Sequence, residues 1–227
     1  MARTQAADYE ERRDAIVEQA ANLFAARGFL GASLSDIADA CNTSKSLLYH
    51  YYPSKEDILF AVMHSHVAAL LDAAQTVVAQ TLEPAQTLRM LTREFMKRYV
   101  GAAARQKVLL NELGNLPSER RKAIVDIQHQ LIEIVHDVLT KLRPDLSSHE
   151  SLKRPAVMLY FGMINWTHTW MDEAGAAKPA LIADLAANIF LGRISQDRAL
   201  TKEKRRPEDR LHSQTQCLPV TDRGRRL

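Results

Sequence analysis

Apolar residues recur every three to four positions along most of the chain, and this spacing predicts an all-α protein. Strand-like alternation is almost absent, and no Asn-Gly or Asp-Gly hairpin turn occurs. Prolines and glycines separate the helical stretches. Beyond residue 53, the predicted helices cover Ser54–Ala73, Pro84–Gly101, Arg105–Leu113, Ser118–Leu142, Ser148–Met171 and Lys178–Ile194.

A long N-terminal helix is predicted from Tyr9 to Arg27, where Gly28 suits its C-terminal end. Its apolar stripe consists of Ile16, Ala20, Leu23 and Phe24.

Two short helices joined by a tight turn follow the long one. Ser33, with Asp36 three residues later, forms a near capping box for the first, and Ser44 caps the second. Asn42 between them tolerates a left-handed backbone, and Pro53 ends the second helix. Two short helices behind a longer support helix form a helix-turn-helix unit.

Charge does not by itself point to DNA. The chain carries a net charge of +3, but residues 1–58 hold six Lys and Arg against nine Asp and Glu. The excess of positive charge lies in residues 196–227, with nine Lys and Arg against five Asp and Glu. This segment lacks apolar periodicity and is predicted to be a disordered basic tail. It could add nonspecific DNA affinity or be a solvated extension.

Catalytic and metal-binding motifs are absent from the sequence. It has no HExxH motif, nucleophile elbow or glycine-rich phosphate loop, and His64 and His66 would point to different helix faces. We therefore expect no enzyme activity, no metal and no cofactor. Without an apolar run of about 18 residues or a signal segment, we also expect no membrane contact and a cytoplasmic location. The distant Cys41 and Cys217 agree with a reducing compartment.

In a helix-turn-helix unit, the N-terminal residues of the second helix meet base edges in the major groove. Lys45, Ser46 and Leu47 occupy these positions, whereas Leu48 is better placed to face the core. Later polar and aromatic groups are predicted to contact phosphate oxygens. The candidate DNA-binding residues are Ser33, Ser44, Lys45, Ser46, Leu47, Tyr49, His50, Tyr51 and Lys55.

Residues 12–59 resemble the DNA-binding domain of the TetR family of bacterial transcriptional regulators. The matching segments are residues 20–24 (AANLF), 27–29 (RGF), 33–38 (SLSDIA) and 44–59 (SKSLLYHYYPSKEDIL). The chain departs from the family at Asn42-Thr43, often Gly-Val, and at Tyr51-Tyr52, often His-Phe. The extra hydroxyl at Tyr52 could reach a phosphate or stay within the domain.

The resemblance implies a homodimer whose C-terminal helices bind an inducer that releases DNA. We expect a DNA-binding domain at 1–55, a ligand-binding and dimerisation domain at 56–195, and the tail at 196–227. In the family, the last two helices form a four-helix interface with their copy. The corresponding candidates are Tyr160, Ile164, Thr167, Met171, Leu181, Leu185 and Ile189, although an ordinary intramolecular core explains the same pattern.

An effector pocket is predicted among the middle helices. The candidate lining residues are Phe95, Tyr99, Leu113, Ile127, Leu131, Phe161, Asn165 and Trp166, each of which could instead belong to the core. Residues 161–170 resemble a segment of family members near acyl-CoA or aromatic-acid breakdown genes, which suggests an acyl-CoA or aromatic acid effector.

Together, these features predict a homodimeric repressor that binds a palindromic double-stranded DNA operator and is released by a small molecule. The alternatives are a transcriptional activator and an architectural DNA-binding protein without an effector.

Overall fold

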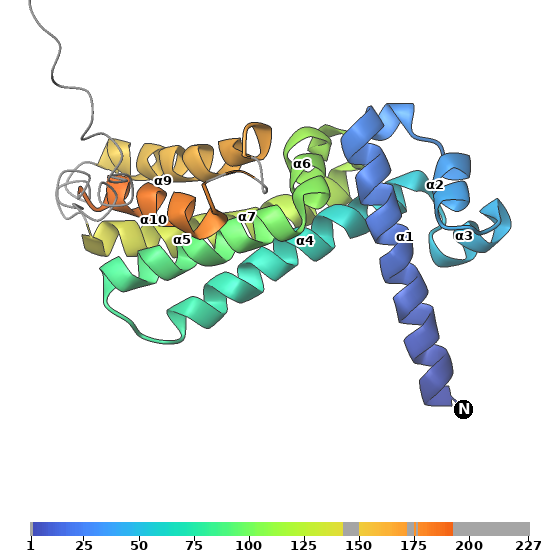
Figure 1. Ribbon diagram of the computed structural model, residues 1–227, viewed down its shortest axis with the longest axis horizontal. Coiled ribbons are helices and arrows are strands. Elements are labelled where there is room, and N and C mark those ends of the chain that lie inside the picture. Colours follow the sequence, from blue (N-terminus) through green and yellow to red (C-terminus); the bar gives the residue numbers. More distant parts are fainter. Residues whose placement is uncertain (1, 143–149, 172–174, 176, 193–227) are drawn as a thin grey trace, which may run out of the picture. The chain divides into compact units, whose positions relative to one another are not determined.

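The computed structural model describes residues 2–142, 150–171, 175 and 177–192, and all regular structure within these ranges is helical. The all-α prediction is therefore confirmed for this part of the chain (Figure 1). The tail at 196–227 and the predicted helix start at Ser148 lie outside the described residues. The last described helix ends at Phe190 and its cap at Leu191, so the predicted end at Ile194 is wrong. The helices are α1 (Ala2–Gly31), α2 (Leu34–Ala40), α3 (Lys45–Tyr51), α4 (Lys55–Val78), α5 (Pro84–Gly101), α6 (Ala103–Asn111), η1 (Leu113–Asn115), α7 (Ser118–Leu142), α9 (Glu150–Asn165), η2 (Trp166–Thr169) and α10 (Pro179–Phe190).

α2 and α3 form as their capping residues predict, whereas α1 begins at Ala2, seven residues before the predicted start at Tyr9. Gly28 has φ 73° and ψ 163° and interrupts α1, which resumes for one short turn to Gly31. Ser33 and Ser44 cap α2 and α3 through their side chains. Asn42 in the connecting turn has φ 50°, the left-handed conformation that its short polar side chain tolerates.

Later helices agree with the sequence pattern where proline or glycine marks their ends. α5 begins and ends at the predicted residues, and α7 begins at Ser118 as predicted and continues to Leu142, where this described range ends. α4 continues to Val78, five residues past the predicted end at Ala73. α9 ends at Asn165, and the chain continues as the 3-10 turn η2 where an α-helix to Met171 was expected.

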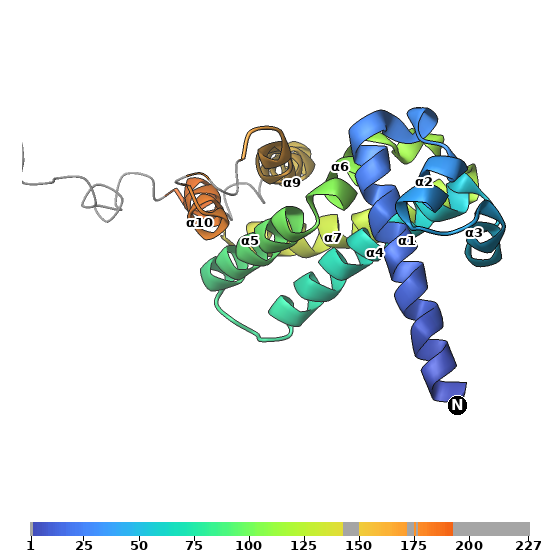
Figure 2. The same cartoon turned by 45° about the vertical axis from the view of Figure 1, so that its right-hand side comes forward.

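Helix α4 lies at the centre of the packing. It contacts α1, α5, α6 and α7, whereas α10 packs on α5 and α9, and α1 lies against α6 (Figures 1 and 2). Buried side chains from α1, α2 and α3, among them Phe24, Ile37 and Leu48, join those of the later helices in one continuous core. The reading head (α1, α2 and α3) and the helices that follow it are thus packed together within residues 1–192.

The apolar character of α4 exceeds the sequence expectation. By length and composition alone, Lys55–Val78 could cross a membrane, so the expectation that no such run exists is wrong. Half of its most apolar stretch is buried in the protein, and Leu59, Val62 and Met63 are fully enclosed. A helix at the centre of a core passes the same test, and the packing accounts for its hydropathy.

Candidate DNA-binding surface and effector cavity

The first turn of α3 presents side chains to solvent. The Ser44 hydroxyl oxygen accepts a hydrogen bond from the Leu47 backbone N–H at 3.1 Å, which fixes the start of the helix. Lys45, Ser46 and Leu47 are exposed, and Leu48 is buried in the core as predicted. The residues expected at base edges therefore share an accessible surface, although their contacts with DNA remain predictions.

The aromatic residues at the end of α3 divide between surface and core. Tyr49 and His50 are exposed, whereas Tyr51 is half-buried against Tyr9 of α1, with ring centroids 4.8 Å apart. Tyr52 is buried, and the Arg13 guanidinium lies over its ring, 5.6 Å from the centroid. Burial raises the pKa of Tyr52. The sequence left open whether this extra hydroxyl reaches a phosphate or stays within the domain. Because Tyr52 is buried, it stays within the domain.

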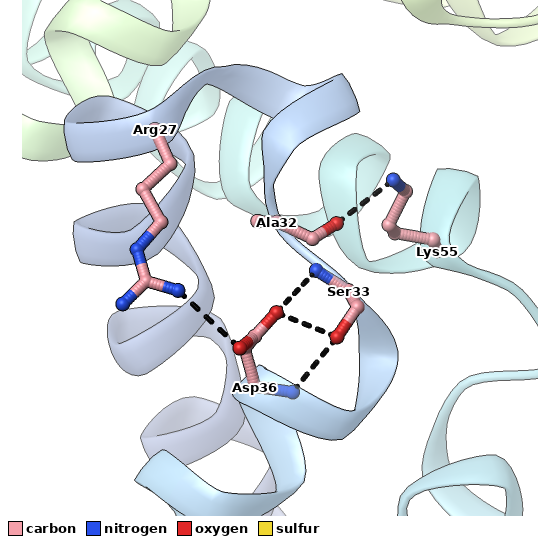
Figure 3. A network of polar contacts seen from close by, with 5 residues as sticks. All are labelled: Arg27, Ala32, Ser33, Asp36 and Lys55. Carbon is pink, nitrogen blue, oxygen red and sulfur yellow. Dashed lines mark hydrogen bonds and ion pairs between the residues drawn. The ribbon is translucent and has the colours of Figure 1, made fainter.

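Ser33 is engaged in a closed set of hydrogen bonds with Asp36 (Figure 3). Its hydroxyl and its backbone N–H donate to Asp36 Oδ2 at 2.5 and 2.8 Å, and the Asp36 N–H donates to Ser33 Oγ at 3.1 Å. Arg27 donates to the other carboxylate oxygen at 3.3 Å. The bonds from Ser33 and then the Arg27 charge hold the pKa of Asp36 below its usual value. The Ser33 hydroxyl hydrogen is thus already used within the cap.

Lys55 joins the start of α4 to the end of α1 (Figure 3). Its Nζ donates to the carbonyl oxygens of Phe29 and Ala32 at 2.8 and 2.9 Å and lies 4.2 Å from the centroid of the Phe29 ring. Two of the three ammonium hydrogens are therefore bonded within the protein. This clamp was missed in the sequence, because its partners precede Lys55 by 23 and 26 residues and are backbone atoms.

A cavity of about 170 Å³ lies among α4, α5, α6, α7 and α9. Four of the predicted ligand residues line it, namely Tyr99, Leu131, Phe161 and Asn165. The described residues that line it are Val67, Leu70, Tyr99, Gln106, Leu109, Leu110, Gln128, Leu131, Ile132, Met158, Phe161 and Asn165.

The other four candidates lie elsewhere. Phe95 is buried behind the cavity, stacked on Tyr99 at 6.4 Å between centroids and packed against Phe161. Leu113 and Ile127 are partly buried against the core without lining the cavity. Trp166 begins η2 with 64% of its surface exposed, so its assignment to the pocket is corrected to a surface position.

One end of the cavity carries a chain of polar side chains from three helices. His66 Nε2 of α4 lies 2.7 Å from Gln106 Oε1 of α6, and Gln106 Nε2 donates to Asn165 Oδ1 of α9 at 3.2 Å. The Tyr99 ring lies beside His66, with ring centroids 6.4 Å apart. Burial lowers the pKa of His66 and raises that of Tyr99, so both are uncharged at neutral pH. No local pattern in the sequence marks this network, since its members lie far apart along the chain.

A groove of about 490 Å³ lies between α7 and α9 and shares Ile132 with the cavity. Its polar lining consists of two imidazoles (His129 and His136), two cationic side chains (Lys153 and Arg154) and one carboxylate (Glu133). In the part of the chain that the structure describes, no group of three or more His, Cys, Asp and Glu side chains has the arrangement of a metal site.

The predicted dimerisation residues separate into two groups. Tyr160 and Ile164 are fully buried, Thr167 is nearly so, and the Tyr160 hydroxyl lies 2.9 Å from Thr92 Oγ1 of α5. For these three, the interface assignment is corrected, because their stripe faces the protein's own core. Met171 is half-buried against that core. Leu181, Leu185 and Ile189 of α10 are each more than 40% exposed.

A second apolar stripe of α9 and η2 faces solvent and was not identified in the sequence. It consists of Leu152, Leu159, Trp166 and Trp170. The first three are spaced by seven residues, a signal that could have revealed this outer face beside the inner one.

An ion pair connects α1 to α6, and a second joins α4 to α7. The Arg105 guanidinium of α6 donates to Glu18 of α1 at 2.8 and 3.1 Å. Arg120 of α7 pairs with Asp57 at the start of α4 and lies over the Phe60 ring. The first pair lies where α1 packs against α6, and the second lies where α4 packs against α7.

Fold and surface together define a helical DNA-binding regulator with a helix-turn-helix head. Residues 16–62 match the model of the bacterial regulatory proteins of the tetR family, and residues 81–194 match that of the tetracyclin repressor-like C-terminal domain. The chain belongs to the TetR family of transcriptional regulators.

Several relatives extend this comparison. A TetR-family transcriptional regulator from Bordetella parapertussis 12822 is 40% identical, with a TM-score of 0.76 over 79% of this chain and 93% of that one. The transcriptional repressor KstR2 of Mycolicibacterium smegmatis is 28% identical over 82% of this chain and 91% of its own length. The crystal structure of AibR in complex with isovaleryl coenzyme A and operator DNA is 25% identical, with a TM-score of 0.70 over 79% of this chain and 98% of that one.

Proposed function

We propose that the protein is a ligand-responsive repressor that binds a palindromic operator as a homodimer in the cytoplasm and releases it when an effector enters the cavity. The observation that carries this proposal is the position of Gln106. It lines the cavity and directly follows Arg105, whose guanidinium bonds Glu18 on the helix behind the reading head. A shift of α6 around a ligand would act on α1 through this pair.

On DNA, we assign residues 1–55 to the reading head and residues 56–195 to the effector and dimerisation domain. Lys45, Ser46 and Leu47 would lie in the major groove, and Tyr49 and His50 would meet the phosphate backbone. This surface is accessible, but the domain is acidic overall. Affinity for DNA therefore depends on the few side chains that contact it and not on the net charge of the domain. One head makes few contacts, and two related by a two-fold axis fit a palindromic site.

We assign the dimer interface to the exposed apolar residues of α9, η2 and α10. Leu159 is 70% exposed, and Leu152, Trp166, Leu181, Leu185 and Ile189 also carry large exposed surfaces. α9 and α10 contact each other, so a second copy of the pair would complete a four-helix arrangement. Exposed apolar surface of this extent on two adjacent helices is typical of an interface.

For the effector, we favour an acyl-CoA over an aromatic acid. The cavity is mostly apolar and none of the described residues that line it is charged, whereas the groove beyond Ile132 carries Lys153, Arg154 and two histidines. An acyl chain in the cavity with phosphates in the groove would use both environments. The bound ligand named for AibR is of the same class.

The test is release of operator DNA. A fluorescent fragment of the region upstream of the protein's own gene should bind the purified protein and dissociate when short-chain acyl-CoA thioesters are added. Free coenzyme A and the matching free acids are the controls. Absence of release by any thioester, with DNA binding intact, would reject the effector class, and absence of specific DNA binding would reject the proposed function itself.

A further inference from the structure

At the polar end of the cavity, the chemistry of the side chains decides which group donates and which accepts in each hydrogen bond. Gln106 Oε1 is an acceptor, so the buried His66 must donate from Nε2. The other end of the same amide, Gln106 Nε2, donates to Asn165 Oδ1. With its oxygen turned to Gln106, Asn165 directs its NH₂ group away from that bond. This series of hydrogen bonds therefore ends in a donor, the NH₂ group of Asn165.

The rest of the polar lining is also uncharged. The Tyr99 phenol stays protonated because burial raises its pKa, and Gln128 adds a second neutral amide. Arg105 is the charged residue next to Gln106, but its guanidinium is bonded to Glu18 and it does not line the cavity. A carboxylate placed here would lose its hydration without gaining a cation.

We infer that the cavity binds an uncharged group of about the size of a short acyl chain that carries a carbonyl oxygen, that Asn165 donates the hydrogen bond to this oxygen, and that free carboxylates are rejected. The volume of about 170 Å³ is small, so the group held there is of the size of a short acyl chain. Apolar side chains such as Leu131, Ile132 and Met158 would surround the alkyl part. His66 and Gln106 are positioning residues that act through Asn165.

This inference rests on the proposed function only in taking the cavity as the effector site, so binding is measured without DNA. The probes are methyl isobutyl ketone and isovalerate, which share a branched skeleton and have the same number of non-hydrogen atoms but differ in charge. Ligand-observed NMR titration of the full chain should show at least tenfold tighter binding of the ketone. Equal or tighter binding of isovalerate would overturn the inference.

The donor role of Asn165 is tested by Asn165→Asp, which keeps the shape and replaces the NH₂ donor by an acceptor. Ketone binding should fall at least tenfold. Asn111→Asp is the matched control, because Asn111 is exposed on α6, outside the cavity lining, and should leave ketone binding unchanged. Retained ketone binding in folded Asn165→Asp would contradict the assignment.

Two further measurements separate positioning from folding. In ¹⁵N-labelled wild-type protein, the Asn165 side-chain NH₂ signals should shift on ketone addition and not on isovalerate addition, so the test does not depend on a variant that folds. His66→Phe should weaken ketone binding and His66→Gln, which retains an N–H donor, should restore it. If the ketone binds as expected but no acyl compound releases operator DNA, the proposed function fails while this inference stands.

Discussion

The Lys55 ammonium lies 2.8 Å from the carbonyl oxygen of Phe29, a residue that follows the interruption of α1 at Gly28. The same ammonium bonds Ala32 and lies over the Phe29 ring. One cation at the start of α4 therefore holds the chain between the support helix and the helix-turn-helix unit. The orientation of the reading head depends on this clamp as well as on its apolar core.

Replacing Lys55 by Met should lower the free energy of unfolding by about 1.5–3 kcal/mol, the range for hydrogen bonds with a charged partner. Urea denaturation measures this loss. If the remaining ammonium hydrogen also reaches a phosphate, the slope of log affinity against log salt should become shallower by about 0.9. Unchanged stability would contradict the clamp, and lower stability with an unchanged slope would limit Lys55 to a structural role.

Lys45→Ala should change the ranking of operator variants, because Lys45 lies in the first turn of α3, where side chains meet base edges. Tyr49→Phe is the comparison, since loss of a phosphate contact should weaken binding about equally on every sequence. Fluorescence anisotropy on a panel of single-base operator variants gives both results. A uniform loss for Lys45→Ala would make Lys45 a backbone contact.

The sequence predicted local features well because caps, glycines and prolines act over a few residues. Ser33, Ser44 and Asn42 adopt the conformations that their chemistry favours, and the ends of α5 and α7 follow Pro84, Gly101 and the proline before Ser118.

Long-range relationships were not predictable in the same way. α9 has two apolar stripes, and periodicity alone does not say which one faces α5. The inner stripe, with Tyr160 and Ile164, was therefore assigned to the interface that the outer stripe, with Leu159, fits better. His66, Gln106 and Asn165 meet only because three helices converge, and no local pattern marks them.

Leu159→Glu combined with Leu185→Glu should convert a dimer into a monomer, because each places a charge in the proposed apolar interface. Light scattering at micromolar concentration measures the mass. Leu30→Glu is the matched control, since Leu30 is 83% exposed near the end of α1 and should leave the mass unchanged. A dimeric double variant would place the interface elsewhere.

Arg105→Gln should reduce the ability of an effector to release DNA while leaving effector binding within about threefold, since its partner is Glu18 and not the cavity. The expected change is a smaller difference between operator affinities measured with and without a saturating acyl-CoA. Arg93→Gln removes a comparable ion pair, to Asp184 of α10 at 2.7 Å, and should not alter this difference. Equal effects of the two variants would show that the Arg105–Glu18 pair carries no specific coupling.

His66 should make the protein less stable in mild acid. Burial holds the pKa of folded His66 below its unperturbed value of 6.5, so above that pH both the folded and unfolded states are neutral at this residue. As the pH falls below 6.5, the unfolded chain takes up a proton that the folded chain resists, and the free energy of unfolding decreases until the folded pKa is reached, by at most about 1.4 kcal/mol per pH unit.

Thermal unfolding between pH 7.5 and 5.5 should therefore show a smaller decrease for His66→Gln than for wild type. His64→Gln should follow wild type, because His64 is exposed beside Phe60. If His66→Gln and wild type lose stability in parallel, His66 takes up its proton equally in both states, and its buried bond to Gln106 is not maintained in solution.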